Sequence, residues 1–246
     1  MEKNIKNVTW VLVAFILVVG MVGSSMVVTN GIVKAKGAQN TLEVKGSAKK
    51  EIKSDFVVWN GSFSIQSTDL SDAYTRLKES SNKVKAYLVN KGMKEEDLIL
   101  SSINTMTYNR VLPNGNYTNE IESYKLYQNV EIRSNDVDKI TSISRSVTDL
   151  INEGVEFQSN PPQYFYTKLS DLKIDMIVLA TKDAKVRAEK MLETTGNSVG
   201  RLYSARVGVF QITPLYSNEI SDYGINDTSS LEKEITAVVS CEFEVK

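Results

Sequence analysis

The sequence contains no histidine, the side chain that most often serves as a general base near neutral pH and as a ligand of transition metals. It has one cysteine, Cys241, so neither an intramolecular disulfide nor a cysteine-based zinc site can form. It has no glycine-rich phosphate loop, and a serine nucleophile would need a lysine or carboxylate as its base. Residues 196–200 match G-x-S-x-G, but they follow a predicted helix and precede a predicted strand, the reverse of the strand–turn–helix order that a nucleophilic serine of this motif requires. We therefore expect no enzymatic activity, no catalytic residues, no cofactor and no metal. An enzyme that uses carboxylates is the least favoured alternative.

Long runs of basic residues are also absent, since the longest is the pair Lys49 and Lys50. Four lysines and one glutamate give the first 36 residues a net charge of +3, so the total of −1 leaves −4 for the rest. A mildly acidic domain lacks the positive surface on which nucleic-acid binding depends. We therefore expect no nucleic acid among the partners.

What the sequence does have is an uncharged stretch between Lys6 and Lys34, with an apolar run over residues 8–28. A helix of about 20 residues spans the hydrocarbon core of a bilayer. The run is longer than the apolar core of most signal peptides, although a cut after Ser24 or Ser25 would follow small residues. We predict an N-terminal membrane anchor or signal segment over residues 1–36, with an uncleaved single-pass helix favoured over a cleaved signal.

Localisation follows from this segment. Five lysines lie within residues 34–50, on the C-terminal side of the run, which by the positive-inside rule favours a cytoplasmic domain. Long folded domains are nevertheless exported largely regardless of charge. We therefore expect a cell-membrane protein with its domain outside the cytoplasm, the alternative being a secreted or periplasmic protein after signal cleavage.

Beyond residue 36 the pattern predicts alternating strands and helices. Residues 41–66 are rich in β-formers, and Asp69 is a good N-cap for a helix that ends at Gly92. Strands follow over residues 98–108 and 124–132, joined by a turn in which Asn114 and Gly115 supply positive φ angles. A second helix spans about residues 136–152.

The pattern then repeats without identity of sequence. Residues 155–166 are extended, residues 170–195 form a long helix, residues 201–213 a strand, and residues 231–245 a final strand that alternates apolar and polar side chains. The predicted fold is α+β: two β-α-β-β repeats, residues 41–134 and 154–246, joined by a helix. We expect a mostly antiparallel sheet with helices packed on one face, in one domain over residues 37–246.

Several segments resemble the SIMPL-domain family of exported bacterial and archaeal proteins, typified by periplasmic immunogenic proteins and an oxidative-stress-defence protein. The segments are residues 41–46, the helix from Asp69 to Gly92, residues 97–99, residues 180–189 and residues 194–202. The family often has Pro-Asp where this chain has Ser54 and Asp55, and its Pro- and Ala-rich loop is here a polar segment over residues 214–230. The resemblance implies an extracytoplasmic protein that assembles into oligomers, and it implies no catalytic residues.

Tyrosines are the most distinctive candidates for contact with a partner, because exposed tyrosines are favoured at interfaces. Eleven are present, several of them around one predicted hairpin and others in the 214–230 segment. The possible partner contacts are Tyr117, Tyr124, Tyr127, Tyr216 and Tyr223. The alternative is that these side chains only cover strand faces.

Three further features have simpler explanations than a functional site. Cys241 shares a face with apolar residues of the last strand, so we expect a buried thiol rather than a redox sensor. The acidic residues 95–97 fit a solvated turn better than an acid–base pair. Glu219, Asp222 and Asp227 could offer oxygen ligands to a hard cation, but their spacing fits no known loop.

The sequence thus favours a membrane-anchored extracytoplasmic SIMPL-type protein. Its expected partners are the membrane and further copies of itself. Its expected role is in cell-envelope integrity or stress tolerance. The alternative is a soluble exported binding module that captures a small molecule, peptide or glycan through tyrosine-bearing loops.

Overall fold

The computed structural model describes residues 17–26, 28–29 and 40–246. Residues 17–26 and 28–29 are helical, and their large aliphatic side chains are exposed. Within the described ranges, no helix has both the length and the apolarity needed to cross a membrane. Residues 1–16, 27 and 30–36 of the predicted anchor lie outside these ranges, so the transmembrane helix stays a prediction.

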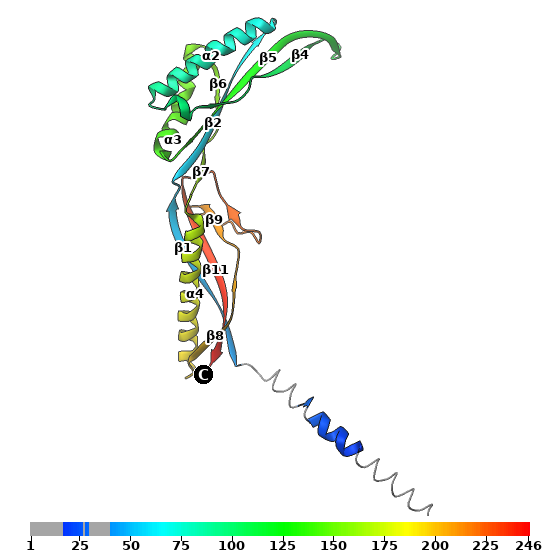
Figure 1. Ribbon diagram of the computed structural model, residues 1–246, viewed down its shortest axis with the longest axis vertical. Coiled ribbons are helices and arrows are strands. Elements are labelled where there is room, and N and C mark those ends of the chain that lie inside the picture. The colour runs from blue at the N-terminus through cyan, green and yellow to red at the C-terminus, as the bar shows by residue number, and fades with distance from the viewer. Residues whose placement is uncertain (1–16, 27, 30–39) are drawn as a thin grey trace, which may run out of the picture. The chain divides into compact units, whose positions relative to one another are not determined.

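The rest of the chain has the α+β class that the sequence predicts, with two mostly antiparallel sheets (Figure 1). Its elements in chain order are β1 (Thr41–Lys53), β2 (Phe56–Ser67), α2 (Leu70–Asn90), η1 (Glu95–Asp97), β3 (Ile99–Leu100), β4 (Asn104–Val111), β5 (Tyr117–Ser134), α3 (Val137–Ser146), η2 (Val147–Glu153), β6 (Glu156–Ser159), β7 (Gln163–Phe165), α4 (Leu169–Glu193), β8 (Val199–Val207), β9 (Gln211–Pro214), β10 (Ile225–Asn226) and β11 (Glu232–Val245).

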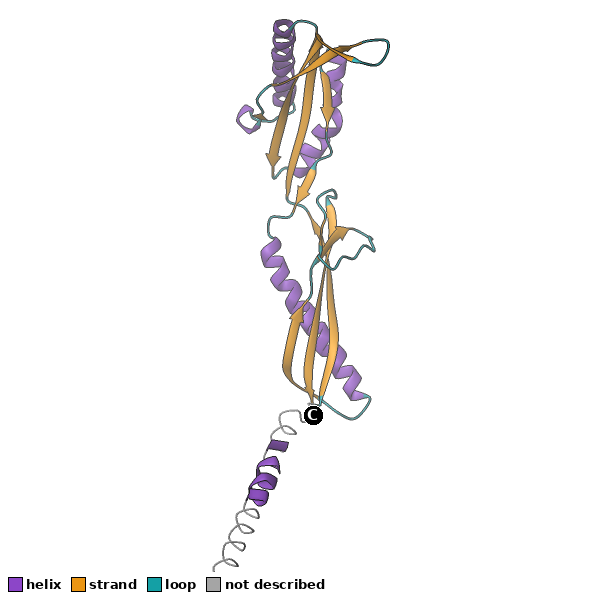
Figure 2. Ribbon diagram, turned by 90° about the vertical axis from the view of Figure 1, so that its right-hand side faces the viewer, coloured by secondary structure: helices purple, strands orange, loops and turns teal. Residues whose placement is uncertain are grey.

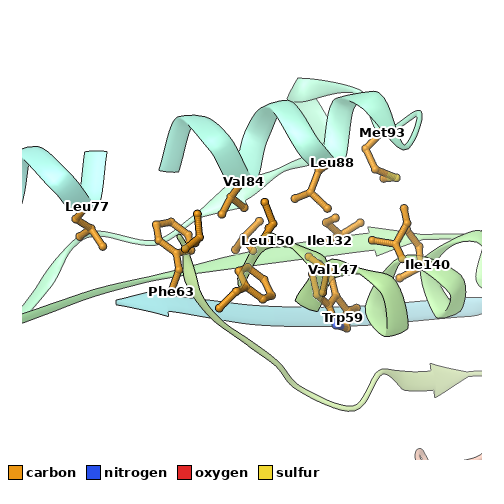
Figure 3. Packing of buried hydrophobic residues seen from close by; sticks show 14 of the residues in the cluster. Trp59, Phe63, Leu77, Val84, Leu88, Met93, Ile132, Ile140, Val147 and Leu150 are labelled. Carbon is orange, nitrogen blue, oxygen red and sulfur yellow. The ribbon is translucent and has the colours of Figure 1, made fainter. Parts of the chain in front are cut away.

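The first sheet has six strands in the order β3-β5-β2-β6, with β4 paired to β5 and β7 paired to β2. Helices α2 and α3 and the 3-10 helix η2 share one hydrophobic core with the side of β2 that carries Trp59 and Phe63. Figure 3 shows Leu77, Val84 and Leu88 of α2 pointing into this core, toward the sheet and η2. The helices therefore cover one face of this sheet, and burial of their apolar side chains is the main stabilising contribution.

Local signals set the ends of these elements. The Asp69 side chain accepts a hydrogen bond from the Asp72 backbone N–H at 2.7 Å, which caps α2. Asp136 caps α3 in the same way through the Lys139 N–H. Gly115 has a φ of +83° in the turn between β4 and β5, a conformation that glycine adopts without steric cost.

The second sheet has five strands in the order β1-β11-β9-β10, with β8 also paired to β11. Alternate residues of β11 are buried, as the sequence predicts. Helix α4 runs beside these strands (Figure 2) and buries a row of small and apolar residues at a spacing of four. The buried row consists of Leu172, Met176, Ala180, Ala184, Ala188 and Leu192.

Two compact units divide the chain. The larger consists of Ser47–Asp183 and Val207–Val239, and it contains the whole six-stranded sheet. The smaller contains residues 40–46 with Ala184–Arg206 and Ser240–Lys246. Within it, Thr41 donates a hydrogen bond to the Glu242 carboxylate at 2.7 Å, and backbone hydrogen bonds join Ser198 to Lys246 in both directions.

The arrangement of strands differs from the single sheet that the sequence pattern predicts. β1 pairs with β11, nearly two hundred residues away, while β2 pairs with β5 in the other sheet. The chain changes sheets at Ser54 and Asp55, where the Asp55 carboxylate accepts hydrogen bonds from the Thr167 N–H at 2.7 Å and hydroxyl at 2.8 Å. Strand alternation alone carries no information about which sheet a strand joins.

Candidate binding surfaces

The β4–β5 hairpin extends beyond the end of β2 in the six-stranded sheet (Figure 1). Each of the eight residues of β4 is exposed, and both faces of the strand carry side chains in solvent. Large apolar side chains are exposed here, among them Met106 at 50 %, Val111 at 49 % and Ile121 at 49 %. Exposed apolar side chains that lie together favour a contact surface, and these belong to one hairpin.

A groove of about 730 Å³ lies along this hairpin where it meets the end of β2. Tyr117, one of the predicted contact residues, lines it and is 79 % exposed. Tyr108, which is 42 % exposed, lines it as well. The other lining residues are polar apart from Val111: Gln66, Ser67, Thr68, Thr107, Asn109, Val111, Glu122 and Ser123.

The structure does not bring the other predicted hairpin tyrosines into this groove. Tyr124 is partly buried and packs against the hydrophobic core under α2. Tyr127 is also half-buried, further along β5. These two side chains fit the alternative reading, in which tyrosines cover a strand face.

Tyr216 and Tyr223 lie on the long segment between β9 and β11 and are 90 % and 98 % exposed. Tyr216 has a φ of +64°, a left-handed conformation that is uncommon for an aromatic residue. A second pocket, of about 430 Å³, lies under this segment and is lined by Ile220 and Val238 among others, but neither tyrosine lines it. The five predicted contact residues therefore belong to separate surfaces.

A buried lysine anchors the other end of the same segment. The Lys233 side chain, in a residue only 2 % exposed, donates hydrogen bonds to the backbone carbonyls of Tyr164, at 2.7 Å, and of Asp227. These bonds tie β11 to β7 and to the end of the 214–230 segment. Lysine is rarely fully buried unless its ammonium group is paired.

Burial lowers the pKa of Lys233, and the nearby Asp227 carboxylate opposes this effect. Burial by itself raises the pKa of Asp227, but hydrogen bonds from Ser229 and Ser230 and the charge of Lys233 together hold that pKa below its ordinary value. Asp227 Oδ1 accepts hydrogen bonds from the Ser229 N–H and hydroxyl at 2.8 Å and 2.6 Å, and Oδ2 accepts one from the Ser230 N–H at 3.2 Å. This arrangement is structural, since it holds the segment in place.

The remaining candidates from the sequence have ordinary surroundings. Cys241 is fully buried, as predicted, and burial raises the pKa of its thiol. In the described part of the chain, no three side chains of histidine, cysteine, aspartate or glutamate gather where they could hold a metal ion. Glu95 and Glu96 lie on the exposed η1 and form ion pairs with Lys85 and Lys94 at 3.5 Å.

Two features of the structure, the buried Lys233 and the groove, were not among the sites predicted from the sequence. Lys233 occupies an apolar-face position of the alternating β11 strand, and a charge at such a position is a signal that could have identified it. The groove has no comparable signal, because it depends on the pairing of β4 with β5 beyond the end of β2.

These observations define an α+β protein with two mostly antiparallel sheets and with exposed, tyrosine-bearing surfaces on a hairpin and a long loop. A comparison with protein families gives the particular class. Residues 42–243 match the family SIMPL, described as "Protein of unknown function (DUF541)". The chain belongs to this family, which confirms the resemblance found in the sequence. No curated protein matches the chain.

Proposed function

We propose that this SIMPL protein is a non-enzymatic, membrane-anchored extracytoplasmic protein that self-associates and serves cell-envelope integrity or stress tolerance. The apolar run over residues 8–28 supports the anchor. The lack of histidine, together with the burial of the one cysteine, supports a role without catalysis. The single observation that supports self-association is a set of exposed aliphatic side chains on the outward side of α4.

Helix α4 carries aliphatic side chains on the side opposite its buried row. Ile174 and Val178 are 62 % and 61 % exposed and lie four residues apart on one outward row. The row reaches Val186, which is 46 % exposed, only beyond the exposed Lys182. An exposed apolar row on a helix that already packs on a sheet favours contact with a second surface. Tethering to one membrane would raise the effective concentration of copies, so even a weak contact would be populated.

Light scattering coupled to size-exclusion chromatography of the full chain in detergent tests this proposal. We expect a defined oligomer, and we expect Ile174→Lys combined with Val178→Lys to shift it toward monomer, because paired lysines oppose burial of the row. The matched control is Leu70→Lys with Tyr74→Lys, an exposed pair at the same spacing on α2, 44 % and 49 % exposed. A monomeric wild-type protein would contradict self-association, and an α4 variant that stays oligomeric would contradict the assignment to α4.

The second candidate function is a binding module that captures a ligand through its tyrosine-bearing segments. The observation that favours it is the groove on the β4–β5 hairpin, which Tyr108 and Tyr117 both line with partly exposed side chains. Small-ligand sites are usually concave and combine aromatic side chains with convergent polar groups, and this groove has both, with polar groups in the majority. Ligand binding that survives Tyr-to-Ala changes at both positions would contradict this function.

A further inference from the structure

The chemistry of the hairpin groove narrows the class of ligand that it would accept. Of its lining residues, only Glu122 carries a formal charge, and neither lysine nor arginine lines the groove among the described residues. Phosphate, sulfate and carboxylate ligands depend on such cations for charge-assisted hydrogen bonds. The groove therefore disfavours anionic ligands.

Neutral hydrogen-bonding groups make up most of the remaining wall. Gln66 and Asn109 offer amides, which both donate and accept, and Ser123 offers a hydroxyl. The Gln66 amide already donates to the Ser123 hydroxyl at 2.7 Å, which orients both groups at the wall of the groove. A ligand with many hydroxyl groups can form hydrogen bonds with several of these amide and hydroxyl groups at once.

The two groove tyrosines are spaced along the hairpin. Tyr108 pairs with Ser123, while Tyr117 pairs with Val111, three residues further along β4. Three residues of an extended strand span at most about 10 Å, which is comparable to the length of a disaccharide. Aromatic faces carry partial negative charge and attract the polarised C–H bonds of a sugar ring.

We propose that this groove binds a neutral oligosaccharide, with Tyr108 and Tyr117 each stacking on a sugar ring. The inference rests on the second candidate function and is independent of self-association through α4. A peptide strand is the competing occupant, since it could pair with the free edge of β4. Register irregularities between Tyr108 and Asn109 and between Asn109 and Val111 interrupt that edge, and such bulges oppose strand addition.

The test is isothermal titration calorimetry of the full chain in a detergent without a sugar headgroup. The probes are cellohexaose and chitohexaose as neutral oligosaccharides, hexagalacturonate as an acidic one, and a pool of dodecapeptides. We expect at least one neutral hexasaccharide to bind, and Tyr108→Ala or Tyr117→Ala to weaken its binding about tenfold, since a tenfold loss corresponds to the energy of one aromatic contact. Tyr117→Phe keeps the ring and is expected to keep the binding.

Tyr223→Ala is the matched control, because this tyrosine is 98 % exposed and lies outside the groove. Binding of a hexasaccharide that is unchanged by both groove variants would overturn the assignment to this groove. Preference for hexagalacturonate, or binding of peptides alone, would overturn the ligand class while leaving a binding function. Binding of none of the probes would overturn this inference and would leave the second candidate function only with a small molecule as its ligand.

Discussion

At the scale of single residues, the burial of Lys233 is the least expected feature of the larger unit. Its ammonium group contacts two backbone carbonyls rather than a carboxylate. A buried charge is tolerated when hydrogen bonds replace those that it made with water. Here these hydrogen bonds also join β7, β11 and the 214–230 segment, so Lys233 stabilises the contact between these three parts of the chain.

Replacing this lysine should therefore destabilise the fold. Lys233→Met keeps much of the volume but leaves the carbonyls of Tyr164 and Asp227 without their ammonium donor. We expect the free energy of unfolding, measured by urea denaturation followed by circular dichroism, to fall by about 1–3 kcal/mol. Lys49→Met is the control, since the Lys49 side chain is 63 % exposed in its ion pair with Glu234 and its loss should cost less than about 1 kcal/mol. Equal effects of the two changes would contradict this role for Lys233.

Asp227 should make the stability sensitive to acid. Its pKa in the folded protein lies below the ordinary value, so the unfolded chain binds protons first as the pH falls. This contribution is fully present above the ordinary pKa, about 4, and is lost as the pH falls through the folded value. In urea denaturation at pH 7 and pH 3, Asp227→Asn should lose less stability on acidification than the wild type. Asp222→Asn, on the exposed part of the same loop, is the control, and an equal loss in Asp227→Asn and wild type would contradict the prediction.

At the scale of elements, the ends of helices and turns could be predicted because their causes are local. Asp69 caps α2 as predicted, and Asp136, where the second helix was expected to start, caps α3. Gly115 takes the positive φ predicted for the hairpin turn, whereas Asn114 does not, so that part of the prediction was wrong. The alternation of buried and exposed residues in β11 could also be predicted, since one face of the strand contacts the core along its length. For the helix caps and the turn, the residues that determine the structure lie within a few positions in the sequence.

Breaks inside elements were harder to predict. The extended segment at residues 155–166 divides into β6 and β7 around Pro161 and Pro162, because proline cannot donate to a strand ladder. The helix expected over residues 136–152 is an α-helix only as far as Ser146 and continues as the 3-10 helix η2. The exposure of Tyr117 and the partial burial of Tyr124 depend on how far β5 extends past β2, which is a property of the pairing and not of either tyrosine.

At the scale of the whole molecule, the family and the α+β class followed from the sequence, whereas the pairing of β1 with β11 did not. Pairing across such a separation is decided by the complete core of each sheet, so no local segment indicates it. The same holds for the surfaces. The outward row of α4 and the hairpin groove are defined by what the fold leaves uncovered, and hydrophobic periodicity alone does not distinguish a covered face from an uncovered one.

The proposed anchor is the property that most affects how these surfaces work, and it can be tested on the intact protein. We expect full-length protein to stay in the membrane fraction after carbonate extraction, with an intact mass that includes residues 1–36. Val18→Arg places a charge near the middle of the apolar run, at a cost of about 3 kcal/mol for a spanning helix, and should shift the protein to the soluble fraction. Ser47→Arg, in the domain beyond the run, is the control and should leave the distribution unchanged. Recovery of a soluble wild-type protein whose mass corresponds to a cut after Ser24 or Ser25 would contradict the anchor and favour a released binding module. Copies of such a module are not concentrated on a membrane surface, so weak contacts through α4 would be sparsely populated.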